Sequence, residues 1–239
     1  MDPSILTGHV EDDPSVVALA ALVREWEPHL DLAAFRDDPL VYEPDGTLYA
    51  VGLGPGVTLS ARHKAKAFRR GDAIVVPRSV AIDAEPGVDL VAIRHDGTPP
   101  YHFRERFIQT WGYEHRPAPE AGTVGGDFEV IPEDDARYRV PCRLVRSTRS
   151  GRAGSTGPDL HLWAGLGGEG TIQDAATGRG VDLVAGTLAL ILPACSYRVE
   201  GSLVAARLVL RTEVLYMEHL AEQLRRPAPT WTPEFDPRA

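Results

Sequence analysis

The sequence has few of the residues that build disulfide scaffolds or membrane spans. Only two of its 239 residues are cysteines, Cys142 and Cys195, which is too few for a disulfide framework. No apolar run approaches the roughly 18 residues of a membrane helix. The first residues, MDPSILTGHVEDDPS, contain neither a basic start nor an apolar core, so no signal peptide is predicted and a cytoplasmic protein is expected.

The chain also lacks a surplus of basic residues. Its formal net charge is −9, and a polyanion such as nucleic acid is bound mainly through an excess of Lys and Arg. Nucleic acid is therefore excluded as the main partner, as the lack of an apolar span excludes a membrane, and a small-molecule ligand is the expected partner.

Glycine and proline are plentiful, with 23 and 20 residues. In residues 159–210, short apolar runs such as LHLWA, LALIL and SLVAARLVL alternate with glycine-bearing turns every eight to twelve residues. This spacing predicts an antiparallel β barrel or sandwich. Two amphipathic helices are predicted beside it, at about 13–27 and 213–226. The apolar face of the first helix is formed by Val16, Leu19, Ala20 and Val23.

Three segments recur in the same order. LYAVGLGPGVTL at 48–59 matches LWAGLGGEGTI at 162–172, an offset of 114. The strand that starts at Gly71 matches one that starts at Gly186, an offset of 115. LVAIR from Leu90 matches LVAAR from Leu203, an offset of 113. Such collinear matches predict two copies of one β unit, which we place at residues 1–116 and 117–239.

The two copies resemble cupin barrels, and their arrangement resembles a bicupin. The resemblance is carried by GDAIVVP in the first copy and by LGGEGTI and AGTLALILPA…YRVEG in the second. The second block is similar to the carboxy-terminal cupin barrel of type I phosphomannose isomerases. The resemblance implies an all-β fold of two tandem cupin (double-stranded β-helix, or jelly-roll) barrels with a flanking helix at each end. It also implies association into a homodimer.

Catalytic cupins hold a metal with a His-x-His pair, a Glu and a later His, and alternate residues of one strand can present two imidazoles to one ion. Mapped onto this sequence, the Glu position is His161 in the second copy and Thr47 in the first. The His-x-His region of the second copy is SGRAGSTG, around 154–157, and the later His falls near Tyr197 or Arg198. The usual metal set is therefore degenerate.

Four residues of the second copy are the predicted ligand-binding residues. Strand alternation places His161 and Trp163 on one side, facing the barrel interior. With Tyr197 and Arg198 they would line a pocket for a small polar ligand such as a sugar or sugar phosphate. The alternative is that His161 and Trp163 are ordinary core residues.

Six residues are weaker candidates for a divalent transition metal such as Zn, Fe, Mn or Ni. Cys142, His161 and Cys195 would form a soft zinc site if they converged. In the segment between the copies, His102, Glu105 and His115 offer a second set, although interleaved arginines also suit a salt-bridged connection.

The sequence is compatible with three functions. The first is a ligand-binding bicupin without the usual metal. The second is a metal-dependent isomerase or oxygenase with an altered ligand set. The third is a structural cupin that assembles into dimers.

Overall fold

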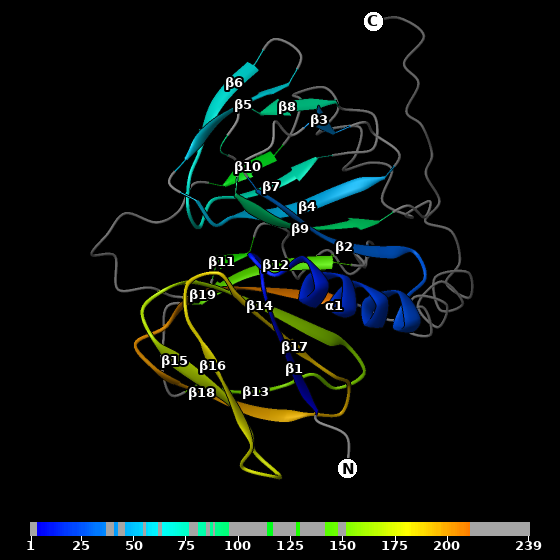
Figure 1. Ribbon diagram of the computed structural model, residues 1–239, viewed down its shortest axis with the longest axis vertical. Coiled ribbons are helices and arrows are strands. Elements are labelled where there is room, and N and C mark those ends of the chain that lie inside the picture. Colours follow the sequence, from blue (N-terminus) through cyan, green and yellow to red (C-terminus); the bar gives the residue numbers. More distant parts are fainter. Residues whose placement is uncertain are drawn as a thin grey trace, which may run out of the picture.

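The computed structural model describes residues 4–36, 41–42, 46–54, 56–61, 64–76, 81–84, 87, 89–95, 114–116, 128–129, 142–147 and 152–210. Within these residues the chain forms four antiparallel sheets and one helix (Figure 1). The predicted all-β class is confirmed. The helix expected at 213–226 lies outside the described residues, and no helix within them is long and apolar enough to cross a membrane.

The elements occur in the following order along the chain: β1 (Ile5–His9), α1 (Asp13–Trp26), β2 (Leu30–Phe35), β3 (Val41–Tyr42), β4 (Thr47–Gly52), β5 (Val57–Ala61), β6 (Lys64–Phe68), β7 (Ala73–Val76), β8 (Ile82–Ala84), β9 (Leu90–His95), β10 (Glu114–Arg116), β11 (Phe128–Glu129), β12 (Cys142–Ser147), β13 (Arg152–Ser155), β14 (Leu160–Gly167), β15 (Gly170–Asp174), β16 (Gly180–Leu183), β17 (Thr187–Ile191), β18 (Ser196–Gly201) and β19 (Val204–Leu210).

The sheets fall into two pairs of similar strand order. We define the amino-terminal unit as the sheet β10-β7-β4-β9-β2 with the sheet β3-β8-β5-β6. The carboxy-terminal unit is the sheet β1-β17-β14-β19-β12-β11 with the sheet β13-β18-β15-β16. The first strand of the chain, β1, pairs with β17 of the carboxy-terminal unit, whereas β10 pairs with β7 of the amino-terminal unit. Residues 5–9, which the predicted boundary assigns to the first copy, thus pair with the second.

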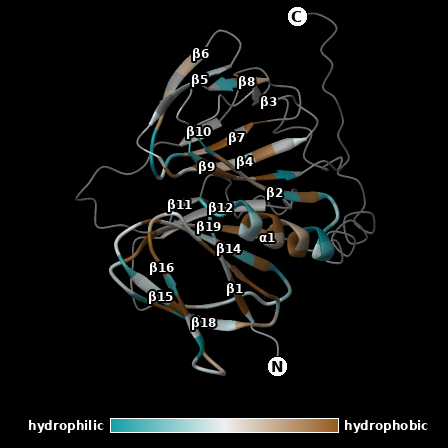
Figure 2. Cartoon of the chain, viewed as in Figure 1, coloured by the Kyte–Doolittle hydropathy of each residue, from teal (hydrophilic) through white to brown (hydrophobic). Residues whose placement is uncertain are grey.

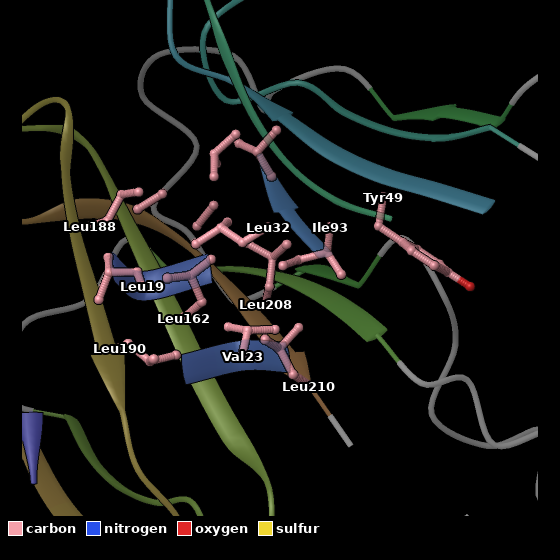
Figure 3. Packing of buried hydrophobic residues seen from close by; sticks show 14 of the residues in the cluster. Leu19, Val23, Leu32, Tyr49, Ile93, Leu162, Leu188, Leu190, Leu208 and Leu210 are labelled. Atoms are coloured by element: carbon pink, nitrogen blue, oxygen red, sulfur yellow. The ribbon is translucent and has the colours of Figure 1, made fainter. Parts of the chain in front are cut away.

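Buried apolar side chains form three clusters. One lies inside the amino-terminal unit and includes Leu48, Phe68 and Ile74. A second lies inside the carboxy-terminal unit and includes Trp163 and Tyr197. The third and largest joins α1 to the outer faces of the two larger sheets (Figure 3). The hydropathy colouring shows hydrophobic residues along the strands of both units (Figure 2).

Helix α1 lies between the two larger sheets and buries one face there (Figures 1 and 3). The predicted face is confirmed, because Val16, Leu19, Ala20 and Val23 are all buried. The helix ends at Trp26, and the Glu27 N–H donates to the carbonyl oxygen of Val23 at 2.9 Å. Burial of a Val or Leu side chain stabilises a fold by about 1.5–3 kcal/mol, so this face helps to hold the two units together.

Each unit contains a pair of hydrogen-bonded glycines, and these pairs show which residues of the two units correspond. Gly71 N–H donates to Gly52 O at 2.8 Å, and Gly186 N–H donates to Gly165 O at 3.0 Å. A Cβ at Gly52 or Gly165 would collide with the carbonyl oxygen of the residue two positions before the partner glycine, which is Arg69 or Val184. Gly52 therefore corresponds to Gly165, an offset of 113.

This offset corrects the alignment of the first repeated segment, for which the sequence match gave 114. A shift of one residue moves a strand residue to the opposite face of its sheet. The sequence match pairs Tyr49 with Trp163, but Tyr49 lies in the cluster between the sheets and Trp163 lies inside the carboxy-terminal unit. The structural counterpart of His161 is Leu48 rather than Thr47.

Candidate functional site

A group of polar side chains lies inside the carboxy-terminal unit. His161 and Trp163 lie on β14, where they pair in register with Val209 and Arg207 of β19. Both side chains contact Tyr197, so they lie on the same side of the strand, as alternation predicts. They are only 6% and 2% exposed. We call His161, Trp163, Tyr197 and Arg207 the polar cluster.

Tyr197 connects the members of this cluster. It lies on β18 in the smaller sheet and is 1% exposed. Its hydroxyl oxygen is 2.8 Å from His161 Nδ1. Its ring lies edge-on to the His161 and Trp163 rings, with centroids 5.7 and 6.1 Å apart and interplanar angles of 85°. Edge-to-face rings at such distances attract each other beyond their burial.

The space for the Tyr197 ring depends on Gly154. This residue is the register partner of Tyr197 on β13. A Cβ at Gly154 would lie 2.5 Å from Tyr197 Cζ, which is closer than two carbon atoms approach without displacement. The predicted His-x-His region therefore presents a glycine to the interior, and the tyrosine ring lies against it.

Arg207 is the member of the cluster that was not predicted. It is partly buried, and its Nη1 donates to the Tyr197 hydroxyl oxygen at 3.3 Å. Its Cζ lies 5.5 Å from the centroid of the Trp163 ring, within the range of a cation–π interaction. The sequence repeat aligns Arg207 with Arg94, at an offset of 113, but the strand pairing matches Arg207 with Ala92, so the repeat did not point to it.

Two donors of the polar cluster have no acceptor among the described residues: Trp163 Nε1 and Arg207 Nε, both buried. A buried donor left without an acceptor costs about 1–3 kcal/mol. Native proteins leave few such groups, and those that occur call for an explanation such as a bound water, an ion or a functional role. Here the two donors occur on side chains that contact each other.

Arg198 does not join the cluster. Alternate residues of β18 are buried and exposed, and Arg198 is on the exposed side. Its Nη1 lies 3.8 Å from Glu200 Oε1, and both side chains are largely exposed. Of the four predicted ligand-binding residues, the structure thus brings together His161, Trp163 and Tyr197, and places Arg198 outside.

The metal candidates do not converge among the described residues, which contain no group of three or more His, Cys, Asp or Glu side chains able to hold an ion. Cys195 is buried, and burial raises the pKa of its thiol. Cys142 occupies the register position of Leu210, whereas His161 pairs with Val209, the neighbouring residue. His102 and Glu105 lie outside the described residues. His115 pairs with Ile74 in the amino-terminal unit, and its side chain lies outside the described part.

One buried carboxylate lies in the same unit. Asp174 ends β15, is 5% exposed and pairs in register with Tyr197. It accepts hydrogen bonds from the Ser4 hydroxyl and from the N–H groups of Ala176 and Thr177. These bonds, that of Ser4 above all, hold the pKa of Asp174 below its ordinary value. Because Ser4 precedes β1, the carboxylate ties the start of the chain to this unit.

No family model matches the sequence, and no curated protein matches it. Solved structures do resemble it. Ylba from E. coli has a TM-score of 0.55 at 10% identity, covering 76% of this chain and 82% of that one. A cupin 2 conserved barrel domain protein from Leptotrichia buccalis has a TM-score of 0.51 at 12% identity, with coverage of 89% and 91%.

A third similar structure is a variant of salicylate 1,2-dioxygenase from Pseudoaminobacter salicylatoxidans. Its TM-score is 0.54 at 9% identity, covering 92% of this chain and 88% of that one. At such low identities the likeness concerns the fold alone. It shows that this chain has the all-β cupin fold.

Proposed function

We propose that this protein binds a small polar molecule inside its carboxy-terminal unit, at the polar cluster. The observation that carries the proposal is a pair of buried donors, Trp163 Nε1 and Arg207 Nε, that find no acceptor within the described ranges. A ligand with oxygen acceptors would satisfy both. His161 and Tyr197 already share a hydrogen bond. The Tyr197 hydroxyl group also accepts from Arg207 Nη1, so these two residues position the guanidinium for a ligand.

The cupin fold supports this location. The interior of a β barrel is a common place for a small ligand, and a structural neighbour, salicylate 1,2-dioxygenase, has been solved in complex with gentisate. That ligand belongs to the neighbour. For this chain we carry over only the expectation that an interior site can hold a small organic molecule.

The sequence also suggests the domain organisation, the location, the oligomeric state and the class of ligand. The two units are taken as tandem cupin barrels divided near residue 116, in a cytoplasmic protein that forms a homodimer. The resemblance to type I phosphomannose isomerases makes sugars and sugar phosphates the first ligands to test. Binding of such a ligand requires no metal, because the four residues of the cluster supply donors that bind it directly.

The test is a ligand panel followed by nuclear magnetic resonance on the purified full chain. The panel contains sugars, sugar phosphates, small carboxylic acids and their neutral amides. A true ligand raises the melting temperature and shifts the indole N–H resonance of Trp163, which disappears in Trp163→Phe. Trp26, which is 43% exposed on α1, provides the control through Trp26→Phe. Melting-temperature shifts that are equal in the two variants, or no response to any compound, would contradict the proposal.

A further inference from the structure

We infer that the group held by this site is a carboxylate, bound between the Arg207 guanidinium and Trp163 Nε1. The inference rests on the proposed function, since it names the chemistry of the ligand that the polar cluster binds. Its starting point is the charge of Arg207. No carboxylate among the described residues pairs with this guanidinium, although it is partly buried and its Nε is fully so.

A guanidinium that is partly removed from water is stabilised by an anionic partner, because the loss of hydration of a charged group is costly unless the charge is paired. Asp174, the register partner of Tyr197, is engaged by Ser4, Ala176 and Thr177. Glu200 pairs with Arg198 on the outer face. Among the described residues, then, no carboxylate balances the charge of Arg207.

Arg94 shows the other outcome in the same chain. It lies on β9, and its Nη2 is 3.1 Å from Asp31 Oδ2 on the neighbouring strand β2. Asp31 also accepts from Arg24 Nη2 at 2.6 Å. The partly buried Arg94 thus has a carboxylate partner within the chain, whereas the partly buried Arg207 contacts a tyrosine and a tryptophan.

The donors of Arg207 favour a planar, bidentate acceptor. Nη1 is used by the Tyr197 hydroxyl, which leaves the edge formed by Nε and Nη2. Such an edge matches the two oxygens of a carboxylate through parallel N–H···O bonds. A carboxylate oxygen has more than one lone pair, so it also accepts from Trp163 Nε1. A single guanidinium balances one negative charge, which suits a carboxylate better than a doubly charged phosphate.

The decisive experiment compares carboxylic acids with their neutral amides. The probes are acetate, benzoate and salicylate against acetamide, benzamide and salicylamide, each titrated into the full chain by isothermal calorimetry. We expect at least one acid to bind ten-fold or more tightly than its amide and to shift the Trp163 indole N–H resonance. Hydrogen bonds to charged groups contribute about 1.5–3 kcal/mol, which corresponds to roughly 10- to 150-fold in affinity.

Three variants locate the bound group. Arg207→Met removes the charge and should abolish the preference for the acid. Trp163→Phe removes one neutral donor and should weaken the acid by about five-fold, the equivalent of one ordinary hydrogen bond. Arg198→Met removes an exposed arginine of the same unit and should change nothing. If Arg207→Met is unfolded by circular dichroism, Arg207→Lys keeps the charge without the fork and should still weaken the acid.

Two results separate the inference from the proposed function. If sugars bind with sensitivity to Trp163→Phe while acids and amides bind equally or not at all, the carboxylate inference is wrong and the proposed function stands. If no compound binds and the variants change only the melting temperature, both are wrong and the polar cluster is structural.

Discussion

The two units use the same strand order to build interiors of different chemistry. With Gly52 matched to Gly165, Leu48 corresponds to His161 and Ala50 to Trp163. Ala50 pairs with Ala92 where Trp163 pairs with Arg207. In the smaller sheets, Ser60 pairs with Asp83 and Gln173 with Arg198, so their neighbours Ile82 and Tyr197 correspond. Every member of the polar cluster thus has an apolar counterpart, and all four counterparts are buried.

This difference shows that the fold itself does not require a polar cluster. Leu48, Ala50, Ile82 and Ala92 all belong to the apolar cluster that fills the amino-terminal unit. Buried polar groups cost stability unless they are fully hydrogen-bonded. The polar cluster contains two buried donors for which the described part of the chain offers no acceptor. Such a cost, at positions where the amino-terminal unit has apolar residues, favours a role in binding.

The second unit also adjusts its packing to hold the larger side chains. Trp163 pairs with Ala189, whereas Ala50 pairs with Ile74. Large and small residues have therefore exchanged places between two neighbouring strands. Gly154 makes a similar adjustment opposite Tyr197.

The largest expected effect comes from giving the second unit the alanine of the first. Trp163→Ala removes a buried ring and leaves a cavity, so it should lower the free energy of unfolding by about 3–5 kcal/mol. Adding Ala189→Ile, which imitates Ile74, should recover part of the loss by filling that space. Trp26→Ala on the exposed part of α1 is the control. Chemical denaturation measures all four proteins, and a loss from Trp163→Ala no greater than that from Trp26→Ala would show that the ring is not packed as described.

The second prediction concerns the glycine that admits Tyr197. Gly154→Ala places a methyl group against the tyrosine ring and should cost about 1–3 kcal/mol through overpacking. Gly167→Ala in β14 is the matched control, because a Cβ there meets nothing within 4 Å. Combining Gly154→Ala with Tyr197→Ile, the residue of the first unit, should remove the strain. If the double variant loses as much stability as the two single variants together, the ring and the glycine are not coupled.

A third prediction concerns the hydrogen bond between His161 and Tyr197, whose counterparts in the amino-terminal unit are apolar. Tyr197→Phe removes the hydroxyl group that contacts both His161 and Arg207, and should cost about 1–2 kcal/mol by leaving polar groups unpaired. His161→Leu combined with Tyr197→Phe should cost less than the two single changes added together, because both partners are then gone. A double-mutant cycle by denaturation measures the difference, and strict additivity would contradict the contact.

Sequence periodicity predicted the elements of this fold better than their register. The apolar face of α1 and the shared side of His161 and Trp163 follow directly from periods of 3.6 and 2. The repeat alignment was wrong by one residue at Tyr49, because the order of apolar residues is similar on both faces of a strand that is buried on both sides. The pairing of β14 with β19 also shifts between Gly165 and Gly167, and no local pattern predicts such a shift.

Among the site residues, alternation could have corrected one prediction. Tyr197 and Arg198 are neighbours on one strand, so they face opposite sides and only one of them can point inward. Arg207 was harder to find. Its contact with Trp163 depends on the pairing of two strands 44 residues apart in sequence, which becomes visible only when the register is known.

The smallest expected effect concerns Asp174, whose counterpart in the first unit is Ala61. The pKa of Asp174 is depressed, chiefly by the Ser4 hydroxyl, so its stabilisation is present above the ordinary carboxyl pKa of 3.8 and is lost as the pH falls through the lower folded value. Ser4→Ala removes the largest cause, so the pKa of Asp174 should rise towards its ordinary value, and the acid-induced loss of stability should become smaller and be complete at a higher pH. Carbon-detected titration of the Asp174 carboxyl group from pH 6 to 2 measures the shift, with exposed Ser196→Ala as control. The amino-terminal unit has no carboxylate at this position. Acid should therefore weaken the pairing of β1 with the carboxy-terminal unit before it affects the amino-terminal unit. Hydrogen exchange, measured at β1 and at β2, can determine that order.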